Sequence, residues 1–308
     1  MRKRRMLSLI FMSCFILFMT LSGCQSGSTD PRPKIVCTIG MIADIVKNVG
    51  GEHIVVTGLM GPGVDPHLYK AKKSDINSLS QADIIFYNGL HLEAKLTDVF
   101  EKMQRRKTTV AITDYYPKSD LLSSIQYPDQ HDPHVWFDVQ IWQTAVKVVR
   151  DTLSEKYPAH KADFQKNAAL YQKELAALHT YILDKVQETP IKQRVLVTAH
   201  DAFRYFGRAY GFTVKGLQGI STASEAGTKD IQDLADFIAK EKIKAIFVES
   251  SIPVRNIKAV QEAVASRGWN VKIGGELFSD AMGTEGTHEG TYIGMVKHNV
   301  DTIVNALR

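Results

Sequence analysis

The tripeptide Asp-Pro-His occurs twice in the chain, at residues 65–67 and 132–134, each time followed by an aliphatic and then an aromatic residue. Proline fixes its own φ angle and biases the preceding residue toward extended backbone, which restricts the orientation of the histidine that follows. The aspartate could cap a helix or orient an imidazole. The repeat therefore separates His67 and His134 from the other histidines as candidates for metal binding.

Two further candidates follow predicted strands in the second half of the chain. His200 comes directly after the apolar run 194–199, and Asp280 comes after the last predicted strand. Ligands of open α/β sheets bind outside the carboxyl ends of the strands, so we expect all four candidates at such an edge. Three imidazoles and one carboxylate suit Zn²⁺ or a similar divalent ion. For each histidine, a surface or hydrogen-bonded role is the alternative, and for Asp280 it is a turn or helix cap.

Glu249 ends another predicted strand, 245–249, on the same edge. It could accept a hydrogen bond from a ligand imidazole, or it could cap the helix that begins near Val254. His131 precedes the second Asp-Pro-His and is either an accessory residue or an exposed neighbour of the site. The remaining histidines share none of this context, and we interpret them as ordinary surface or hydrogen-bonded residues: His53, His91, His160, His179, His288 and His298.

Short apolar runs alternate with helical patterns, which predicts βαβ units and a largely parallel sheet. The strands expected in the first half span residues 34–39, 53–60, 83–88 and 108–113, with helices at 41–49, 74–81 and 92–103 between them. A less regular, proline-containing stretch follows. The pattern restarts after Pro190, with strands at 194–199, 212–217, 245–249 and 271–274 and helices at 202–210, 229–241, 254–266 and 292–307. The fold class is therefore α/β, with two lobes of similar design.

A long helix is predicted between the two lobes, over residues 159–188, between Pro158 and Pro190. Its apolar residues recur at spacings of three, four and seven, which places them on one face. They are Phe164, Tyr171, Leu175, Leu178, Ile182 and Val186. Such a helix is a stiff connector. The expected domains are thus a 34–157 lobe, a 158–189 linker helix and a 190–308 lobe.

The first 23 residues have the form of a targeting segment, with a basic start at residues 2–5 and an apolar run over 6–21. Judged only by its length, the apolar run could instead be a short membrane span. The ending Leu-Ser-Gly-Cys at 21–24 resembles a bacterial lipobox, so Cys24 is predicted to carry a lipid; an ordinary signal peptide is the alternative. Residues 24–33 are rich in small residues and proline and are expected to be a flexible tether.

The composition argues against nucleic-acid binding. Four of the 38 Lys and Arg residues lie in the targeting segment, which leaves 34 against 33 Asp and Glu, a net charge of +1. Nucleic-acid-binding domains are expected to carry a basic patch. Cys37 lies in an apolar strand pattern and is expected to be a buried structural cysteine.

Five motifs together resemble the zinc- and manganese-binding lipoproteins of bacterial ABC importers, and in particular their TroA-like branch. They span residues 61–67, 88–93, 132–138, 198–203 and 275–283, and the resemblance covers essentially the whole mature chain. The resemblance implies two α/β lobes joined by one backbone helix, with a metal ion buried between the lobes. Its ligands here would be His67, His134, His200 and Asp280.

The same resemblance implies a function and partners. The chain would be a lipid-anchored monomer on the extracytoplasmic face of the cell membrane. It would deliver one divalent ion to an ABC permease with a cytoplasmic ATPase. Many manganese-specific members carry Glu where this chain has His200, whereas dedicated zinc binders often carry a His-rich loop that residues 118–132 lack. We therefore expect Mn²⁺ as the cargo, ahead of Zn²⁺ and then Fe²⁺.

Two other functions remain as alternatives. A zinc hydrolase would need an open coordination position and a base, so Asp280 would have to be the base and not a ligand. A surface adhesin has no supporting repeat or motif in the sequence. If three histidines bind the ion, its affinity should fall as the pH drops below about 6.5, because imidazole must be neutral to coordinate.

Overall fold

The computed structural model describes residues 30–124 and 129–308. The predicted signal peptide and the lipidation site Cys24 lie outside the described residues, as does most of the predicted tether. Residues Pro33–Arg308 form one compact unit, to which the rest of the description refers. Within the described residues, no helix is both long and apolar enough to cross a membrane.

The first lobe contains a four-stranded parallel sheet with the order β2-β1-β3-β4. Its strands are β1 (Lys34–Cys37), β2 (Val55–Gly58), β3 (Ile84–Tyr87) and β4 (Thr108–Ala111). The central strands are continuous apolar runs because helices cover both faces of the sheet. Cys37, at the end of β1, is buried with a free thiol, as the strand pattern predicts.

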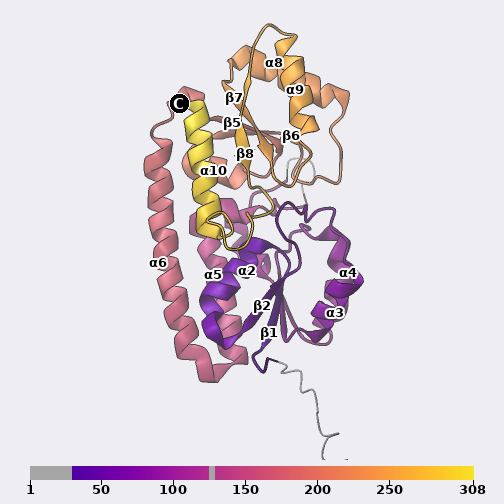
Figure 1. The fold of residues 1–308 in the computed structure, drawn as a ribbon, viewed down its shortest axis with the longest axis vertical. Helices are drawn as coiled ribbons and strands as arrows, with labels where there is room; N and C mark the ends of the chain where they lie inside the picture. Colours follow the sequence, from indigo (N-terminus) through magenta and orange to yellow (C-terminus); the bar gives the residue numbers. More distant parts are fainter. Residues whose placement is uncertain (1–29, 125–128) are drawn as a thin grey trace, which may run out of the picture. The chain divides into compact units, whose positions relative to one another are not determined.

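Four helices cover this sheet: α2 (Gly40–Gly50), α3 (Lys73–Gln81), α4 (Thr97–Gln104) and α5 (Val139–Lys156). Helices α2 and α5 lie on one side of the strands in Figure 1, and α3 and α4 lie on the other. The helix predicted over 92–103 begins later, at Thr97, because Leu90 and His91 have positive φ angles and a 3₁₀ turn (Ala94–Leu96) follows them.

Helix α5 is absent from the sequence-based prediction, because the prolines at positions 117, 128 and 133 favour irregular structure in this part of the chain. The necessary signals are nevertheless present. Asp138 caps the helix by accepting hydrogen bonds from the backbone N–H groups of Gln140 and Ile141. Val139, Trp142, Val146, Val149 and Leu153 are buried at helical spacing.

The second lobe contains two parallel strand pairs, β5 with β6 and β7 with β8, and β5 also lies beside β7. The strands are β5 (Val195–His200), β6 (Thr213–Gln218), β7 (Ala245–Glu249) and β8 (Lys272–Leu277). The helices are α7 (Arg204–Tyr210), α8 (Thr228–Glu241), α9 (Arg255–Ala265) and α10 (Tyr292–Leu307). His200 is the last residue of β5, whereas the prediction placed it just beyond the strand.

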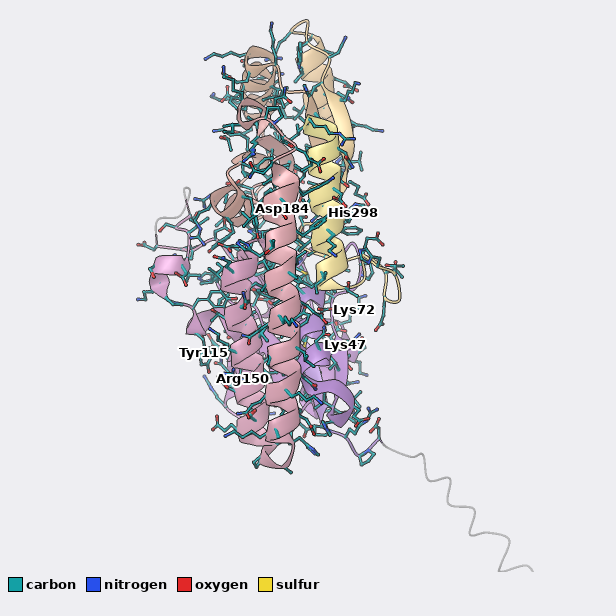
Figure 2. The ribbon with its side chains drawn as sticks, turned by 90° about the vertical axis from the view of Figure 1, so that its left-hand side faces the viewer. Lys47, Lys72, Tyr115, Arg150, Asp184 and His298 are labelled. Atoms are coloured by element: carbon teal, nitrogen blue, oxygen red, sulfur yellow. The ribbon has the colours of Figure 1, made fainter. Side chains whose placement is uncertain are left out.

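Helix α6 (Lys161–Val186) joins the two lobes and has 26 residues, so it is about 39 Å long at about 1.5 Å per residue. A 3₁₀ turn (Pro158–His160) precedes it. It packs against α2 and α5 of the first lobe and against α7 and α10 of the second. Figure 2 shows α6 facing the viewer, with α5 and α10 on either side of it. The six residues predicted for its apolar face are all buried. The prediction of two α/β lobes joined by a long helix is therefore confirmed.

Candidate metal site

The four predicted ligands come together in one buried cluster. The ligand atoms of His67, His134, His200 and Asp280 all lie within 4.8 Å of one another, and every one of these residues is buried. His67 lies in the loop after β2, and His134 immediately precedes the 3₁₀ turn Val135–Phe137. His200 ends β5, and Asp280 lies in the loop after β8. Each lobe thus contributes two side chains.

The donor atoms of the cluster are spaced like neighbouring ligands of a single metal ion. His134 Nε2 lies 3.4 Å from Nε2 of both His67 and His200. Asp280 Oδ2 lies 3.2 Å from His200 Nε2 and 3.6 Å from His67 Nε2, and Asp280 Oδ1 lies 3.4 Å from His134 Nε2. Four donors at about 2.0–2.1 Å from a tetrahedral ion are about 3.3–3.4 Å apart. The four side chains could therefore bind an ion with little movement.

The Asp280 carboxylate is the side chain that points most directly to a bound cation. Both of its carboxylate oxygens are buried, and neither has a hydrogen-bond partner among the described residues. A buried carboxylate without donors is costly, and such groups are usually paired or bound to metal. Because both oxygens face imidazole nitrogens, a divalent ion between them would provide the missing interaction. The donor set therefore fits a divalent metal.

The two Asp-Pro-His segments share a backbone turn, which is the physical basis of the repeat. Asp65 Oδ1 accepts a hydrogen bond of 2.9 Å from the backbone N–H of His67. Asp132 Oδ1 accepts the equivalent bond, 3.0 Å long, from the N–H of His134. An Asp side chain commonly closes such a turn on the residue two positions later. Each turn fixes the backbone from which a candidate ligand projects.

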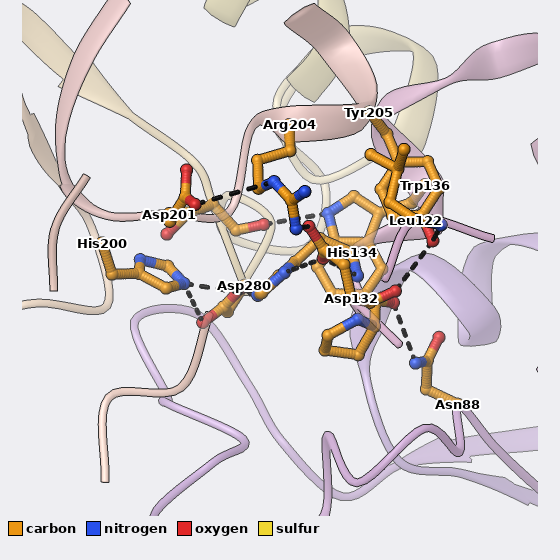
Figure 3. Close-up of polar contacts among 12 residues, drawn as sticks. Asn88, Leu122, Asp132, His134, Trp136, His200, Asp201, Arg204, Tyr205 and Asp280 are labelled. Atoms are coloured by element: carbon orange, nitrogen blue, oxygen red, sulfur yellow. Dashed lines mark hydrogen bonds and ion pairs between the residues drawn. The ribbon is translucent and has the colours of Figure 1, made fainter. Parts of the chain in front are cut away.

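Two of the imidazoles are also held by carboxylates at Nδ1, the ring nitrogen that does not face the other ligands. His134 Nδ1 lies 2.7 Å from Asp132 Oδ1, and His200 Nδ1 lies 2.6 Å from Glu249 Oε2 (Figure 3 shows the His134, Asp132 and His200 side chains). Glu249 Oε1 additionally accepts the backbone N–H of His200 at 2.8 Å. A proton held at Nδ1 leaves Nε2 free to bind a metal.

The Glu249 carboxylate therefore contacts an imidazole, which is one of the two roles that the sequence left open. It makes no side-chain cap for α9, whose N-cap residue is Val254.

The aspartate of the first Asp-Pro-His segment, Asp65, acts differently from Asp132. Asp65 Oδ2 accepts a hydrogen bond of 2.6 Å from the hydroxyl of Thr222, in the loop between β6 and α8. Asp65 thus connects the turn that carries His67 to the opposite lobe. Trp136 makes a similar cross-lobe contact, because its Nε1–H donates to the backbone oxygen of Ser279, next to Asp280.

The carboxylates also set the protonation of the imidazoles. Burial alone lowers the pKa of a histidine, and it lowers the pKa of His67 to about 3. At His134 the carboxylates of Asp132 and Asp280 outweigh burial and raise the pKa to about 9. At His200, Glu249 and Asp280 likewise outweigh burial and raise the pKa well above its usual range. The pKa of Asp280 is raised by burial, but His200 and His134 reverse the shift and hold it well below its usual range.

A cavity of about 220 Å³ reaches the cluster at one corner, where His67 is part of its wall together with Leu90, His91, Pro133 and Ile220. His131 lines a different cavity of about 410 Å³, and its backbone forms an isolated bridge to Ser123. It is therefore not one of the four clustered side chains.

Several contacts around the cluster could not be found from the sequence. Arg204 lies 3.5 Å from Asp132 Oδ2, and the Tyr205 hydroxyl donates to the backbone oxygen of Asp132. Asn88 donates through Nδ2 to the backbone oxygen of Pro133. Each of these residues is far from its partner in sequence, and although Asn88 lies in the motif 88–93, no local pattern indicates which residue it contacts. Two histidines that we interpreted as ordinary, His53 and His160, also lie together with a carboxylate.

Comparison with known proteins gives a consistent family. A family model described as the periplasmic zinc-uptake complex component A, ZnuA, matches residues 35–306. The zinc-binding protein TroA of Treponema pallidum (strain Nichols) is 53% identical over 285 residues, which are 92% of this chain and 92% of that protein. The manganese-binding lipoprotein MntA of Bacillus subtilis (strain 168) is 46% identical over 299 residues, 95% of this chain and 97% of the other.

The solved structure of the periplasmic zinc-binding protein TroA from Treponema pallidum superimposes with a TM-score of 0.88 at 54% identity, covering 90% of this chain and 99% of the other. The resemblance noted in the sequence is confirmed by these matches, which extend over both lobes and the linker helix. The chain belongs to the ZnuA family of metal-binding components of bacterial ABC transporters.

Proposed function

We propose that this chain captures one divalent transition-metal ion between its lobes through His67, His134, His200 and Asp280, and delivers it to an ABC permease for uptake. The observation that carries the proposal is the Asp280 carboxylate, which is buried, has no hydrogen-bond donor among the residues that the structure describes, and faces three imidazole nitrogens at 3.2–3.6 Å. The ion would be cargo, so the site must both bind and release it.

The proposed physiological cargo is Mn²⁺, with Zn²⁺ binding tightly in solution and Fe²⁺ as a further candidate. The relatives do not decide between the two metals, because TroA is named for zinc and MntA for manganese. Intrinsic affinity of a nitrogen-rich site favours Zn²⁺ over Mn²⁺. The position of both Asp280 oxygens toward the imidazoles supports bidentate binding, which would give five donors and suit Mn²⁺ better than a strict tetrahedron.

Replacing Asp280 by Asn tests the ligand set, because the amide keeps the shape and removes the charge. We expect the affinity for Mn²⁺ and Zn²⁺, measured by titration calorimetry of the mature protein, to fall by at least about tenfold, since one charged ligand is worth at least about 1.4 kcal/mol. Asp233→Asn, on the exposed face of α8, is the matched control and should bind as the unchanged protein does. Unchanged affinity in Asp280→Asn would contradict the proposed ligands.

The same variant addresses the alternative functions. A hydrolase that used Asp280 as its base would keep its metal affinity in Asp280→Asn and lose only turnover. The family is one of transport proteins and not of enzymes. None of the relatives reported above supports a surface adhesin either.

The cargo is identified by metal-limited growth. Cells that lack the gene should recover ⁵⁴Mn uptake when they carry the unchanged gene, but not when they carry Asp280→Asn. Rescue under zinc limitation alone would assign Zn²⁺ as the cargo instead.

We also propose that residues 1–23 are removed as a signal peptide and that Cys24 carries the lipid. Residues 24–33 would then tether the rest of the protein to the extracytoplasmic face of the cell membrane. The tethered part consists of the 34–157 lobe, the 158–189 helix and the 190–308 lobe. The support is the lipobox form of residues 21–24 and the naming of relatives such as MntA as lipoproteins. The protein would work as a monomer with a permease and its ATPase. Release of a Cys24→Ser variant from the membrane fraction would support the anchor, and retention would contradict it.

A further inference from the structure

A second group of metal-binding side chains lies outside the buried cluster, at the start of the linker helix. It consists of His53, His160 and Asp163, and one ligand atom of each lies within 4.8 Å of the others. His53 ends the 3₁₀ turn Gly51–His53 before β2, whereas His160 is the N-cap residue of α6 and Asp163 lies in its first turn. Two segments far apart in sequence therefore supply the group.

The positions of these side chains are defined by packing. His53 Nε2 lies 2.9 Å from Asp163 Oδ2, and the rings of His53 and His160 are stacked with centroids 4.1 Å apart and an interplanar angle of 22°. The fully buried Phe164 meets both rings edge-on, at 5.9 Å and 6.1 Å between centroids. The Phe164 ring limits the movement of the two imidazoles, whereas an isolated histidine on the surface has no such restriction.

We propose that His53, His160 and Asp163 form a second, solvent-accessible site for a borderline divalent ion, namely Zn²⁺, Cu²⁺ or Ni²⁺. Two imidazoles and one carboxylate leave positions open for water and are a donor set that binds such ions. Nitrogen donors place Mn²⁺ at the weak end of the affinity order, so this site discriminates against Mn²⁺. The ion takes the place of the proton that now joins His53 to Asp163.

Several features make this site weaker than the buried one. The side chains of His53 and Asp163 are 22% and 57% exposed, so water competes with them. The stacked rings must also rotate before both can direct a nitrogen at one ion. The positive end of the α6 dipole further opposes a cation, and the Asp163 charge offsets this only in part. The site therefore fills after the buried one and exchanges quickly.

An ion at this site would fasten the segment that follows α2 to the first turn of the linker helix. A protein contact already joins these elements, because Asn167 Nδ2 of α6 donates to the backbone oxygen of Val49 in α2. The site thus lies within the first lobe and its linker and uses none of the four clustered ligands.

The number of ions bound per chain tests the proposal. In equilibrium dialysis of the mature protein at pH 7.5, we expect two Zn²⁺ but one Mn²⁺ per chain. His53→Gln, His160→Gln and Asp163→Asn should each lower the zinc stoichiometry to one and leave manganese at one, which also shows that the variants are folded. His288→Gln, which changes an exposed histidine outside both groups, should keep two Zn²⁺.

A spectroscopic measurement identifies the ligands directly. With the buried site filled by Zn²⁺, one equivalent of Cu²⁺, frozen rapidly after mixing so that it cannot displace the buried ion, should give an electron paramagnetic resonance spectrum with coupling to two imidazole nitrogens. His160→Gln should reduce this coupling to one nitrogen. The proposal would be overturned if the unchanged protein bound only one Zn²⁺ per chain. It would also be overturned if His160→Gln still bound two Zn²⁺ per chain. Either result would leave the assignment of the buried site intact, because that assignment is tested through Asp280.

Discussion

Two imidazoles of the buried cluster each meet two carboxylates, and the third meets one. His134 lies against Asp132 and Asp280, His200 against Glu249 and Asp280, and His67 against Asp280 alone. The pKa values follow this count, since those of His134 and His200 are raised and that of His67 is lowered. Protons therefore compete with the metal mainly at His134 and His200.

This competition predicts how metal affinity depends on pH. A raised pKa, about 9 for His134, means that the metal-free imidazole carries a proton below that pH and must lose it to bind an ion. Affinity should therefore rise with pH from 6 up to about 9, where proton competition at His134 ends. His67, with a pKa of about 3, adds no dependence in this range.

Calorimetric titrations in buffers of different ionisation enthalpy should detect proton release on metal binding at pH 7. A flat affinity between pH 7 and 9 without proton release would contradict these protonation states. The expectation from the sequence alone, a loss of affinity only below about 6.5, used the ordinary pKa of histidine. The pH below which affinity is expected to fall is now higher, because Asp132 and Asp280 lie close to the His134 ring. These distances could not be known from the sequence.

At the level of residues, the sequence predicted the cluster because local motifs mark it. The Asp-Pro-His repeat identified His67 and His134, and strand ends identified His200 and Asp280. Thr222 could not be found in this way, because its role exists only when a loop of the second lobe meets Asp65. Contacts of this kind depend on how distant segments pack.

Among the elements, the loop between β6 and α8 is placed to hold the lobes together. Its Thr222 hydroxyl is the donor to Asp65, whose other oxygen fixes the turn of His67. Thr222→Val removes this donor with almost no change of volume and leaves a partly buried carboxylate oxygen of Asp65 without that hydrogen bond. We expect metal to dissociate about tenfold faster in stopped-flow chelation, the equivalent of about 1.4 kcal/mol.

Thr228→Val, at the exposed start of α8, is the matched control for that change and should leave the rate as it is. Equal rates in Thr222→Val and the unchanged protein would show that the hydrogen bond does not contribute to retaining the ion. The unfolding free energy of both variants, from urea titration, separates this effect from a general loss of stability.

The elements themselves were largely predictable, because the buried apolar residues of most strands and helices in this chain follow a regular spacing. Helix α6 was predicted from the spacing of its apolar residues, all of which are buried. Helix α5 was missed although Asp138 marks its start, since proline residues nearby suggested irregular structure. The pairing of strands, such as β2 beside β1, could not be read from periodicity, which has no information on neighbours.

For the whole molecule, the ion would connect two lobes that are otherwise joined by α6 and by contacts such as the buried hydrogen bond from Trp136 to Ser279. A ligand that binds only the folded state stabilises it by about 2.7 kcal/mol at a hundredfold excess over its Kd. For a protein of this size, we expect the melting temperature to rise by about 5–10 °C with either Mn²⁺ or Zn²⁺. Differential scanning calorimetry would measure this shift.

Asp280→Asn should reduce the shift for both metals, whereas His160→Gln should leave the shift with Mn²⁺ in place. A melting temperature that is indifferent to both ions in the unchanged protein would contradict binding between the lobes. A shift with Zn²⁺ but none with Mn²⁺ would argue against manganese as the cargo.

His67 differs from the other two imidazoles in having no carboxylate at Nδ1 among the contacts of the described residues, and it also forms part of the wall of the 220 Å³ cavity. An ion held by four side chains leaves by breaking its bonds one after another. The bond to His67 is the one we expect to break first and to form last, because that ring is the least restrained and the nearest to the cavity. The exchange of a single ligand would then limit the rate at which the ion enters and leaves, while all four together determine how tightly it is held.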